Sequence, residues 1–281
     1  MEYINKTSQE WVERNPEIAI VPIGSFEQHG PHLPLDTDNI QVEAVAEKAA
    51  EALNAFLLPV QRITTCYEHH GKRGSMHYSN HVFGKILTGL IERLYRHGFR
   101  KIVILIGHGG IFITEPTVRH LNYKHKDLHL IYSDYLEVMD FTNMDHAGES
   151  ETSRILYHRP ELVKMEKASD YTPEAPRSYL TYGSFFTHSP TGIWGKGTLG
   201  TAEKGKMLFK KSIAGVIKEI KETFAFVEKT DYAGNPVCVV NSDSNGLVGA
   251  GECPAPGTFP ATGKLDVSRN CLGGAICTEA N

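Results

Sequence analysis

The stretch from residue 24 to residue 38 concentrates side chains of the kinds that bind metal ions. It reads Gly-Ser-Phe-Glu-Gln-His-Gly-Pro-His-Leu-Pro-Leu-Asp-Thr-Asp and holds two histidines and three carboxylates. Imidazole and carboxylate together suit Zn²⁺, Mn²⁺ or Fe²⁺. Glu27 and His29 lie two residues apart, so in an extended loop they point to the same side, and Asp38 returns after a turn. Singly, Asp38 could cap a helix, His32 could lie on the surface and Glu27 could pair with a cation. Together these residues predict a metal site.

Elements with regular spacing surround this stretch and predict how it is held. Continuous apolar runs indicate buried parallel strands at 18–24, 56–60, 101–106 and 128–133. Apolar residues at helical spacing predict helices at 40–54, 82–97, 114–126, 149–158 and 202–228, with Asp38 or Asn39 as N-cap of the first and Gly98 closing the second. Residues 163–200 look irregular. Because strands and helices alternate, we expect an α/β fold, with one mainly parallel sheet and helices on both faces.

Polar clusters follow three of these strands, and parallel strands present their carboxyl ends at one edge. The clusters lie at 25–38, at 107–110 around His108, and at 145–151 around His146. The topology would bring them together. A His-rich loop at 64–81 adds polar groups.

Composition excludes several other classes of protein. The 281 residues carry a formal net charge of −4 and no long basic stretch, so we expect no nucleic-acid partner. No apolar run is long enough for a signal peptide or membrane span, which predicts no membrane association and a cytoplasmic location. Five cysteines at irregular spacing match no CxxC motif and are expected to be reduced structural thiols. Gly, Pro and Cys become frequent near residue 230, so we divide the chain into a domain at 1–229 and an appendage at 230–281.

The first polar stretch closely resembles the signature of the creatininase (creatinine amidohydrolase) family. Further segments over roughly residues 16–225 resemble that family's motifs: Glu68-His69 with Gly74-Ser75, Gly107-His-Gly-Gly110, His146-Ala-Gly-Glu-Ser-Glu-Thr-Ser153, Thr191-Gly-Ile-Trp-Gly195 and Thr201-Ala-Glu-Lys-Gly205. The resemblance implies a three-layer α/β/α hydrolase with two divalent metal ions, Zn, Mn or Fe. It would cleave a C–N bond of a small cyclic or linear amide with a metal-activated water, commonly as a homo-oligomer and possibly a hexamer.

The resemblance also implies roles for individual residues. Glu27 and His108 would bind one metal, His29 the other, and Asp38 both. His146 would move the proton that an amine needs to leave. Substrate contacts would fall to the residues of the remaining motifs, which are Glu68, His69, Gly109 and Trp194.

Departures from the family pattern leave the substrate open between creatinine, a formylamide and another amide. Gly110 stands where creatininase proper has a glutamate that binds the metal shared with His29, and Ile106 and Ile111 replace asparagines. Glu149 and Glu151 are the available substitutes, and about 200° of helix separates them, so one at most can face the metals. We favour Glu151, both as a metal ligand and as a residue that takes part in catalysis. The alternative is that both are first-turn carboxylates at a helix N-terminus.

Three other interpretations stay open. Cys66 near His69 and His70 could be a thiol nucleophile. His69, His70, His77 and His81 could form a metal-binding tract of their own. A non-catalytic member of the same fold could keep its metal for a structural or sensing purpose and act through a partner.

Overall fold

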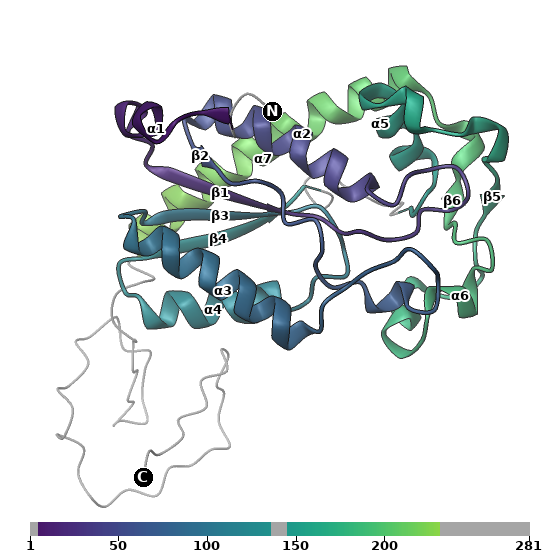
Figure 1. Ribbon diagram of the computed structural model, residues 1–281, viewed down its shortest axis with the longest axis horizontal. Coiled ribbons are helices and arrows are strands. Elements are labelled where there is room, and N and C mark those ends of the chain that lie inside the picture. Colours follow the sequence, from purple (N-terminus) through teal and green to yellow (C-terminus); the bar gives the residue numbers. More distant parts are fainter. Residues whose placement is uncertain (1–4, 136–144, 231–281) are drawn as a thin grey trace, which may run out of the picture. The chain divides into compact units, whose positions relative to one another are not determined.

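The computed structural model describes residues 5–135 and 145–230, and Figure 1 shows their arrangement. Four parallel strands form the central sheet in the order β2-β1-β3-β4. They are β1 (Ile18–Ile23), β2 (Phe56–Leu57), β3 (Lys101–Ile106) and β4 (His129–Asp134). Each of the four predicted strands is present, although β2 ends three residues earlier than expected.

Strand register brings the carboxyl ends of the three longer strands into line. Ile23 of β1 is paired with Ile106 of β3, and Ile106 with Asp134 of β4. The loops that leave these strands therefore begin at one edge of the sheet, as the alternation of elements predicts.

Helices cover both faces of the sheet and complete three layers (Figure 1). α2 (Thr37–Leu53) and α7 (Ala202–Thr230) pack on one face, and α3 (Asn80–Arg96) and α4 (Thr114–Lys124) pack on the other. Along β3, Val103 and Leu105 belong to the core with α2 and α7, while Ile102 and Ile104 belong to the core with α3 and α4. Burial on both faces explains why these strands are continuously apolar instead of alternating. The expected three-layer fold is confirmed.

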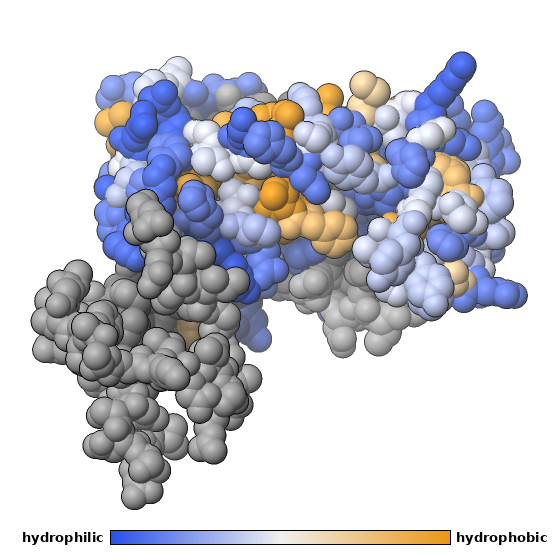
Figure 2. All heavy atoms as spheres, turned by 90° about the horizontal axis from the view of Figure 1, so that it is seen from below, coloured by the Kyte–Doolittle hydropathy of each residue, from blue (hydrophilic) through white to orange (hydrophobic). Residues whose placement is uncertain are grey.

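The face that α3 and α4 cover is mostly hydrophilic on its outer side, with apolar groups in small patches (Figure 2). The apolar stripe of α3 is turned inward, since Phe83, Leu87, Ile91 and Leu94 are all buried. Among the residues that the structure describes, no helix is both long and apolar enough to cross a bilayer.

Shorter elements lie around the three layers. α1 (Ser8–Arg14) precedes β1, and α5 (Glu149–His158) makes many contacts with α7. The stretch 163–200 is irregular as expected, holding α6 (Phe185–His188) and a small antiparallel pair formed by β5 (Asp170–Tyr171) and β6 (Gly195–Lys196). Five 3₁₀ turns complete the described part: η2 (Tyr67–His69), η4 (Pro160–Leu162), η5 (Met165–Lys167), η6 (Arg177–Tyr182) and η7 (Gly197–Leu199).

The predicted start of the helix at 40–54 was wrong. α2 begins at Thr37, its N-cap residue is Asp36, and Asp38 and Asn39 are buried within its first turn. The side-chain nitrogen of Asn39 is committed there, since it donates to the Ser25 carbonyl at 2.7 Å and to Asp36 Oδ1 at 2.8 Å. The prediction at the end of α3 was right, because Gly98 follows the cap residue with a φ of 95° that favours glycine. The predicted appendage lies outside the described residues, which end at residue 230.

Candidate metal centre

A cavity of about 580 Å³ opens at the carboxyl edge of the sheet. Glu27 comes from the loop after β1, Asp38 from the first turn of α2, and His108 from the turn after β3. All three predicted polar clusters and the 64–81 loop contribute to its wall. The other polar or charged lining residues are Glu68, His69, Asn80, Asp134, Asp145, His146, Ser150, Glu151, Arg154, Arg177, Ser178 and Thr181.

One group of candidate ligands gathers around His29. Its Nε2 atom lies 3.2 Å from Asp38 Oδ1 and 3.5 Å from Glu151 Oε2. The other ring nitrogen, Nδ1, lies 3.2 Å from the backbone carbonyl of Glu27. A carbonyl only accepts hydrogen bonds, so the proton of a neutral ring sits on Nδ1, and Nε2 presents its lone pair to the carboxylates.

A second group gathers around His108. Its Nε2 atom lies 3.2 Å from Glu27 Oε2 and 3.0 Å from Glu68 Oε1, and its Nδ1 atom lies 3.1 Å from Asp38 Oδ2. Asp38 thus directs one oxygen to each histidine. Two ligand atoms on one metal at bonds of about 2.1 Å stand about 3.0–3.4 Å apart for right-angled to tetrahedral geometry. The spacings at His29 Nε2 and at His108 Nε2 match that range to within about 0.1 Å, whereas Asp38 faces the other nitrogen of His108, which points away from Glu27 and Glu68.

Unsatisfied buried atoms provide an independent test of whether a cation fits here. Glu27 Oε1, His29 Nε2, Asp38 Oδ2 and His108 Nε2 are all buried and have no hydrogen-bond partner. Burying a polar atom without a partner costs about 1–3 kcal/mol. Four of the five residues that the sequence nominated as ligands therefore carry atoms that a cation would satisfy, and the donor set fits a divalent metal.

Electrostatics in the site reflect the crowding of carboxylates around imidazoles. Burial alone would lower the pKa of His29, but the charges of Glu151 and Asp38 outweigh it and raise that pKa well above its usual value. Burial would likewise raise the pKa of Asp38, and the two histidines reverse this and lower it. The same competition, between burial and His108, lowers the pKa of Glu68 to about 2. The carboxylates are thus held as anions, the form that binds a metal.

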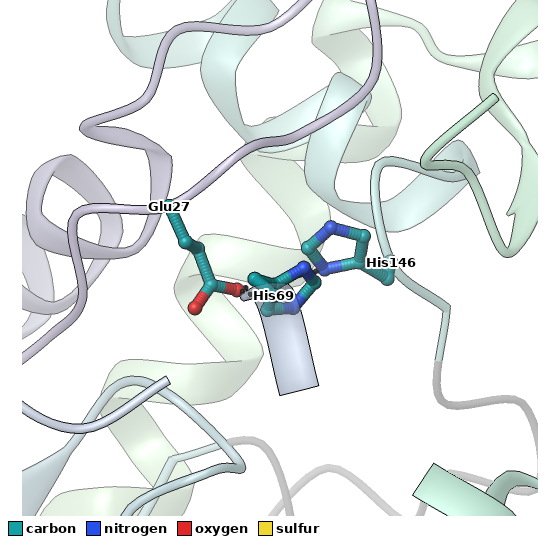
Figure 3. Close-up of side chains that lie close together, drawn as sticks. All are labelled: Glu27, His69 and His146. Carbon is teal, nitrogen blue, oxygen red and sulfur yellow. Dashed lines mark ion pairs between the residues drawn. The ribbon is translucent and has the colours of Figure 1, made fainter. Parts of the chain in front are cut away.

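His146 has one protonation state imposed by its neighbours. Its Nε2 atom lies 2.8 Å from the Gln28 carbonyl, to which it must donate, so Nδ1 carries the lone pair of a neutral ring. Nδ1 lies on the side of Glu27, 3.8 Å from Oε1. Burial, followed by the nearby His29 and His69, lowers the pKa of His146 well below its usual value. Figure 3 shows His146 and His69 side by side, facing the Glu27 carboxylate. Such a ring is neutral at pH 7 and able to accept a proton.

The first turn of α5 separates the two glutamates that the sequence left as alternatives. Glu151 is buried, and its Oε2 atom accepts a hydrogen bond from the Ala147 amide at 2.6 Å. Ala147 has a φ of 51°, and this left-handed residue turns the chain from His146 into the helix. Glu149 is directed elsewhere and pairs with Lys204 on α7. Of the two, the structure brings only Glu151 to the histidines.

The remaining sequence-predicted residues divide into those that line the cavity and those that do not. Glu68, His69 and Gly109 line it. Trp194 does not, and instead lies behind the wall, where its backbone pairs with His146 and its ring packs on Phe185 at 5.7 Å. The proposed tract of four histidines is not assembled. Only His69 joins a group of candidate ligands in the described ranges, whereas His70, His77 and His81 do not.

Gln28 is a residue of the site that spacing did not indicate. Its side-chain oxygen accepts from the Gly30 amide at 3.0 Å, so its Nε2 atom is a donor and can donate to His69 Nδ1 at 3.0 Å; His146 Nε2 is itself a donor to the Gln28 carbonyl and does not accept from it. Gly192 leaves room for it, because a Cβ atom there would lie 2.0 Å from the Gln28 oxygen. An extended loop would turn Gln28 away from Glu27 and His29. Its position depends on packing against the 189–194 segment, for which the sequence holds no local signal.

Fold and site together define a three-layer α/β protein with a candidate metal centre at the carboxyl edge of its sheet. The creatininase family, described as creatinine amidohydrolase, matches residues 4–220 of this chain. The chain therefore belongs to the creatininase family, and the resemblance seen in its motifs is confirmed.

Characterised relatives of the chain are hydrolases. The creatinine amidohydrolase of Pseudomonas putida is 28% identical over 239 residues, which are 74% of this chain and 90% of that protein. The mycofactocin precursor peptide peptidase of Mycolicibacterium smegmatis is 30% identical over 216 residues, 73% of this chain and 84% of that protein. A solved creatininase structure in its Mn form aligns with a TM-score of 0.69 at 22% identity, covering 78% of this chain and 97% of the other.

Proposed function

We propose that this chain is a divalent-metal-dependent amidohydrolase that cleaves a C–N bond of a small cyclic or linear amide. The observation that carries the proposal is the convergence of four buried, unsatisfied ligand atoms, from Glu27, His29, Asp38 and His108, beside a cavity large enough for a small molecule, which three of these residues line: Glu27, Asp38 and His108. Membership of a family whose characterised relatives are hydrolases supports it.

The residues would hold two metal ions, Zn, Mn or Fe. His29 and Glu151 would bind one, His108 and Glu27 the other, and Asp38, which the family resemblance implies as a shared ligand, would bind both. When bound, such ions supply an activated water and polarise an amide carbonyl. The buried carboxylates keep the ligands in place, and the cavity wall keeps bulk water away from the amide.

His146 would move the proton. Its Nδ1 lone pair lies on the side of Glu27, and its lowered pKa keeps the ring neutral, so that this lone pair is present to take a proton from the activated water and pass it to the leaving nitrogen. Gln28 would hold the ring in the productive tautomer through the contact between its carbonyl and Nε2. Amines leave poorly until they are protonated, so this transfer is needed for C–N cleavage.

Release of amine from a panel of small amides, lactams, formylamides and short peptides tests the proposal. Protein is first stripped of metal with a chelator and then reloaded with Mn²⁺ or Zn²⁺. We expect turnover of at least one class of amide to disappear and return with the metal. Full turnover in stripped protein would refute metal dependence. Silence across the panel in fully loaded protein would favour the non-catalytic alternative. Assembly as a homo-oligomer and a cytoplasmic location stay predictions.

A further inference from the structure

Glu68 occupies the space that a side chain at position 110 would fill. A Cβ atom built on Gly110 would lie 2.0 Å from Glu68 Oε1 and 2.5 Å from His108 Nε2, distances that no real pair of atoms tolerates. Gly110 is therefore required for the Glu68 carboxylate to reach His108. Gly110 thus makes room for a charged group, Glu68, directly beside the His108 imidazole.

The contact between Glu68 and His108 is not an ordinary hydrogen bond. Their atoms Oε1 and Nε2 are 3.0 Å apart, yet Nε2 has no hydrogen-bond partner. Both nitrogens of His108 face carboxylates and a neutral imidazole has only one N–H group, so the arrangement needs a further cation, either a second ring proton or a metal ion at Nε2. A metal ion between Nε2, Glu68 and Glu27 would contact all three groups at once.

Geometry also groups Glu68 with two residues already placed at the centre. One ligand atom each from Glu27, Glu68 and His108 lies within 4.8 Å of the others. The Glu68 side chain is 15% exposed and lines the cavity, so it is accessible from the substrate side. Glu68 is the carboxylate beside His108 to which the proposed function assigns no role.

Local structure holds Glu68 in this position. It lies in the 3₁₀ turn η2, which the His69 amide closes by donating to the Cys66 carbonyl at 3.0 Å. The Thr65 hydroxyl donates to the Gly110 carbonyl at 3.0 Å and so ties this loop to the turn after β3. Neither bond involves the carboxylate, which is left for the cavity.

We propose that Glu68 is a ligand of the metal bound by Glu27 and His108, in the space that Gly110 leaves open. The resemblance links position 110 to the metal of His29, but in this structure the position lies beside His108 Nε2. The proposal rests on the proposed function, since it assumes a metal at this position. Glu68 balances charge as well as geometry: with it, the centre has four carboxylates, those of Glu27, Asp38, Glu68 and Glu151, against two divalent cations. A carboxylate beside a buried cation is favourable, because a buried charge needs a partner.

Metal content measured by elemental analysis, after loading with Mn²⁺ and gel filtration, tests the proposal without depending on activity. Glu68→Gln keeps the size of the side chain and removes its charge. We expect it to lose about one metal per chain relative to the parent, with an unchanged far-UV spectrum and a metal-free melting temperature near that of the parent. His70→Ala, an exposed histidine in the same loop, is the matched control and should keep the parent's metal content.

A double variant provides the complementary measurement. In Glu68→Ala/Gly110→Glu the new side chain enters the space that the old one leaves, so it should recover metal that Glu68→Ala alone has lost. Equal metal content and affinity in the parent and Glu68→Gln would overturn the assignment of Glu68 and leave the proposed function intact. A parent that binds no metal would instead refute the proposed function itself.

Discussion

Replacing Glu151 by glutamine should affect its two contacts in the structure to different extents. Its Oε2 atom accepts from the Ala147 amide at 2.6 Å and lies 3.5 Å from His29 Nε2. Glutamine keeps a neutral oxygen for the amide. Hydrogen bonds to charged groups contribute about 1.5–3 kcal/mol and neutral ones about 0.5–1.5 kcal/mol, so the metal-free variant should lose roughly 1 kcal/mol of folding free energy. For a domain of this size that is a fall in melting temperature of about 2–4 °C.

The effect on metal binding should be much larger than the effect on folding. A neutral amide is a poor ligand, so we expect Glu151→Gln to lose about one metal per chain by elemental analysis and most of its activity. Glu149→Gln is the matched control, because Glu149 belongs to the same turn but pairs with Lys204 near the surface. Exposed pairs of this kind contribute about 0–1 kcal/mol.

Two outcomes would refute this reasoning about the first turn of α5. One is equal metal content in the parent and both variants, which would leave Glu151 as a helix residue that only holds Ala147. The other is metal loss in Glu149→Gln but not in Glu151→Gln, which would move the ligand to Glu149.

Other features of the structure lead to four further predictions. His146→Ala should keep its metal and lower kcat by roughly 10²–10⁴-fold, the range for a lost acid–base group, whereas loss of metal would make His146 a ligand. Burial, followed by the charge of Glu27, raises the pKa of Cys66 to about 12. Peptide mapping should therefore find this thiol unmodified by iodoacetamide at pH 8 in folded protein, and Cys66→Ser should stay active. An inactive serine variant would instead support Cys66 as a thiol nucleophile. Gly107→Ala places a Cβ atom 2.5 Å from Val42 Cβ and should destabilise the fold by about 1–3 kcal/mol in urea unfolding, with partial recovery when Val42→Ala is added; an unchanged midpoint would contradict the close packing. Burial, then Arg154, lowers the pKa of His158 to about 4 from 6.5, so the unfolded chain takes up the proton first and stability falls as pH drops from 6.5 towards 4; His158→Gln should flatten that slope in urea titrations.

Much of the fold could be predicted because burial leaves a local record in the sequence. The strand at 101–106 is apolar throughout because both its faces are covered, and the stripe on α3 marks the side that packs on the sheet. The same alternation of elements placed the loops after β1 and β3 at one edge. Glu27, Asp38 and His108 could therefore be nominated together, although the resemblance to a known family supplied their individual roles.

Helix ends were harder to predict, because capping depends on where a side chain is needed. Asp38 looked like a cap, but it is directed into the cavity between His29 and His108, and α2 begins one residue before it. A short polar residue at the start of a helix has the same local sequence signal in either role.

By itself the sequence determined the parallel three-layer fold, the family and the residue types of the metal centre, since each depends on local pattern or on a contiguous motif. Only the tertiary structure decided between Glu149 and Glu151, fixed the tautomer of His146 through Gln28, and brought Glu68 into the space beside Gly110. The physical reason is distance along the chain. Gln28 and His146 are separated by 118 positions, and no local periodicity records which side chain will fill the gap that a distant glycine leaves.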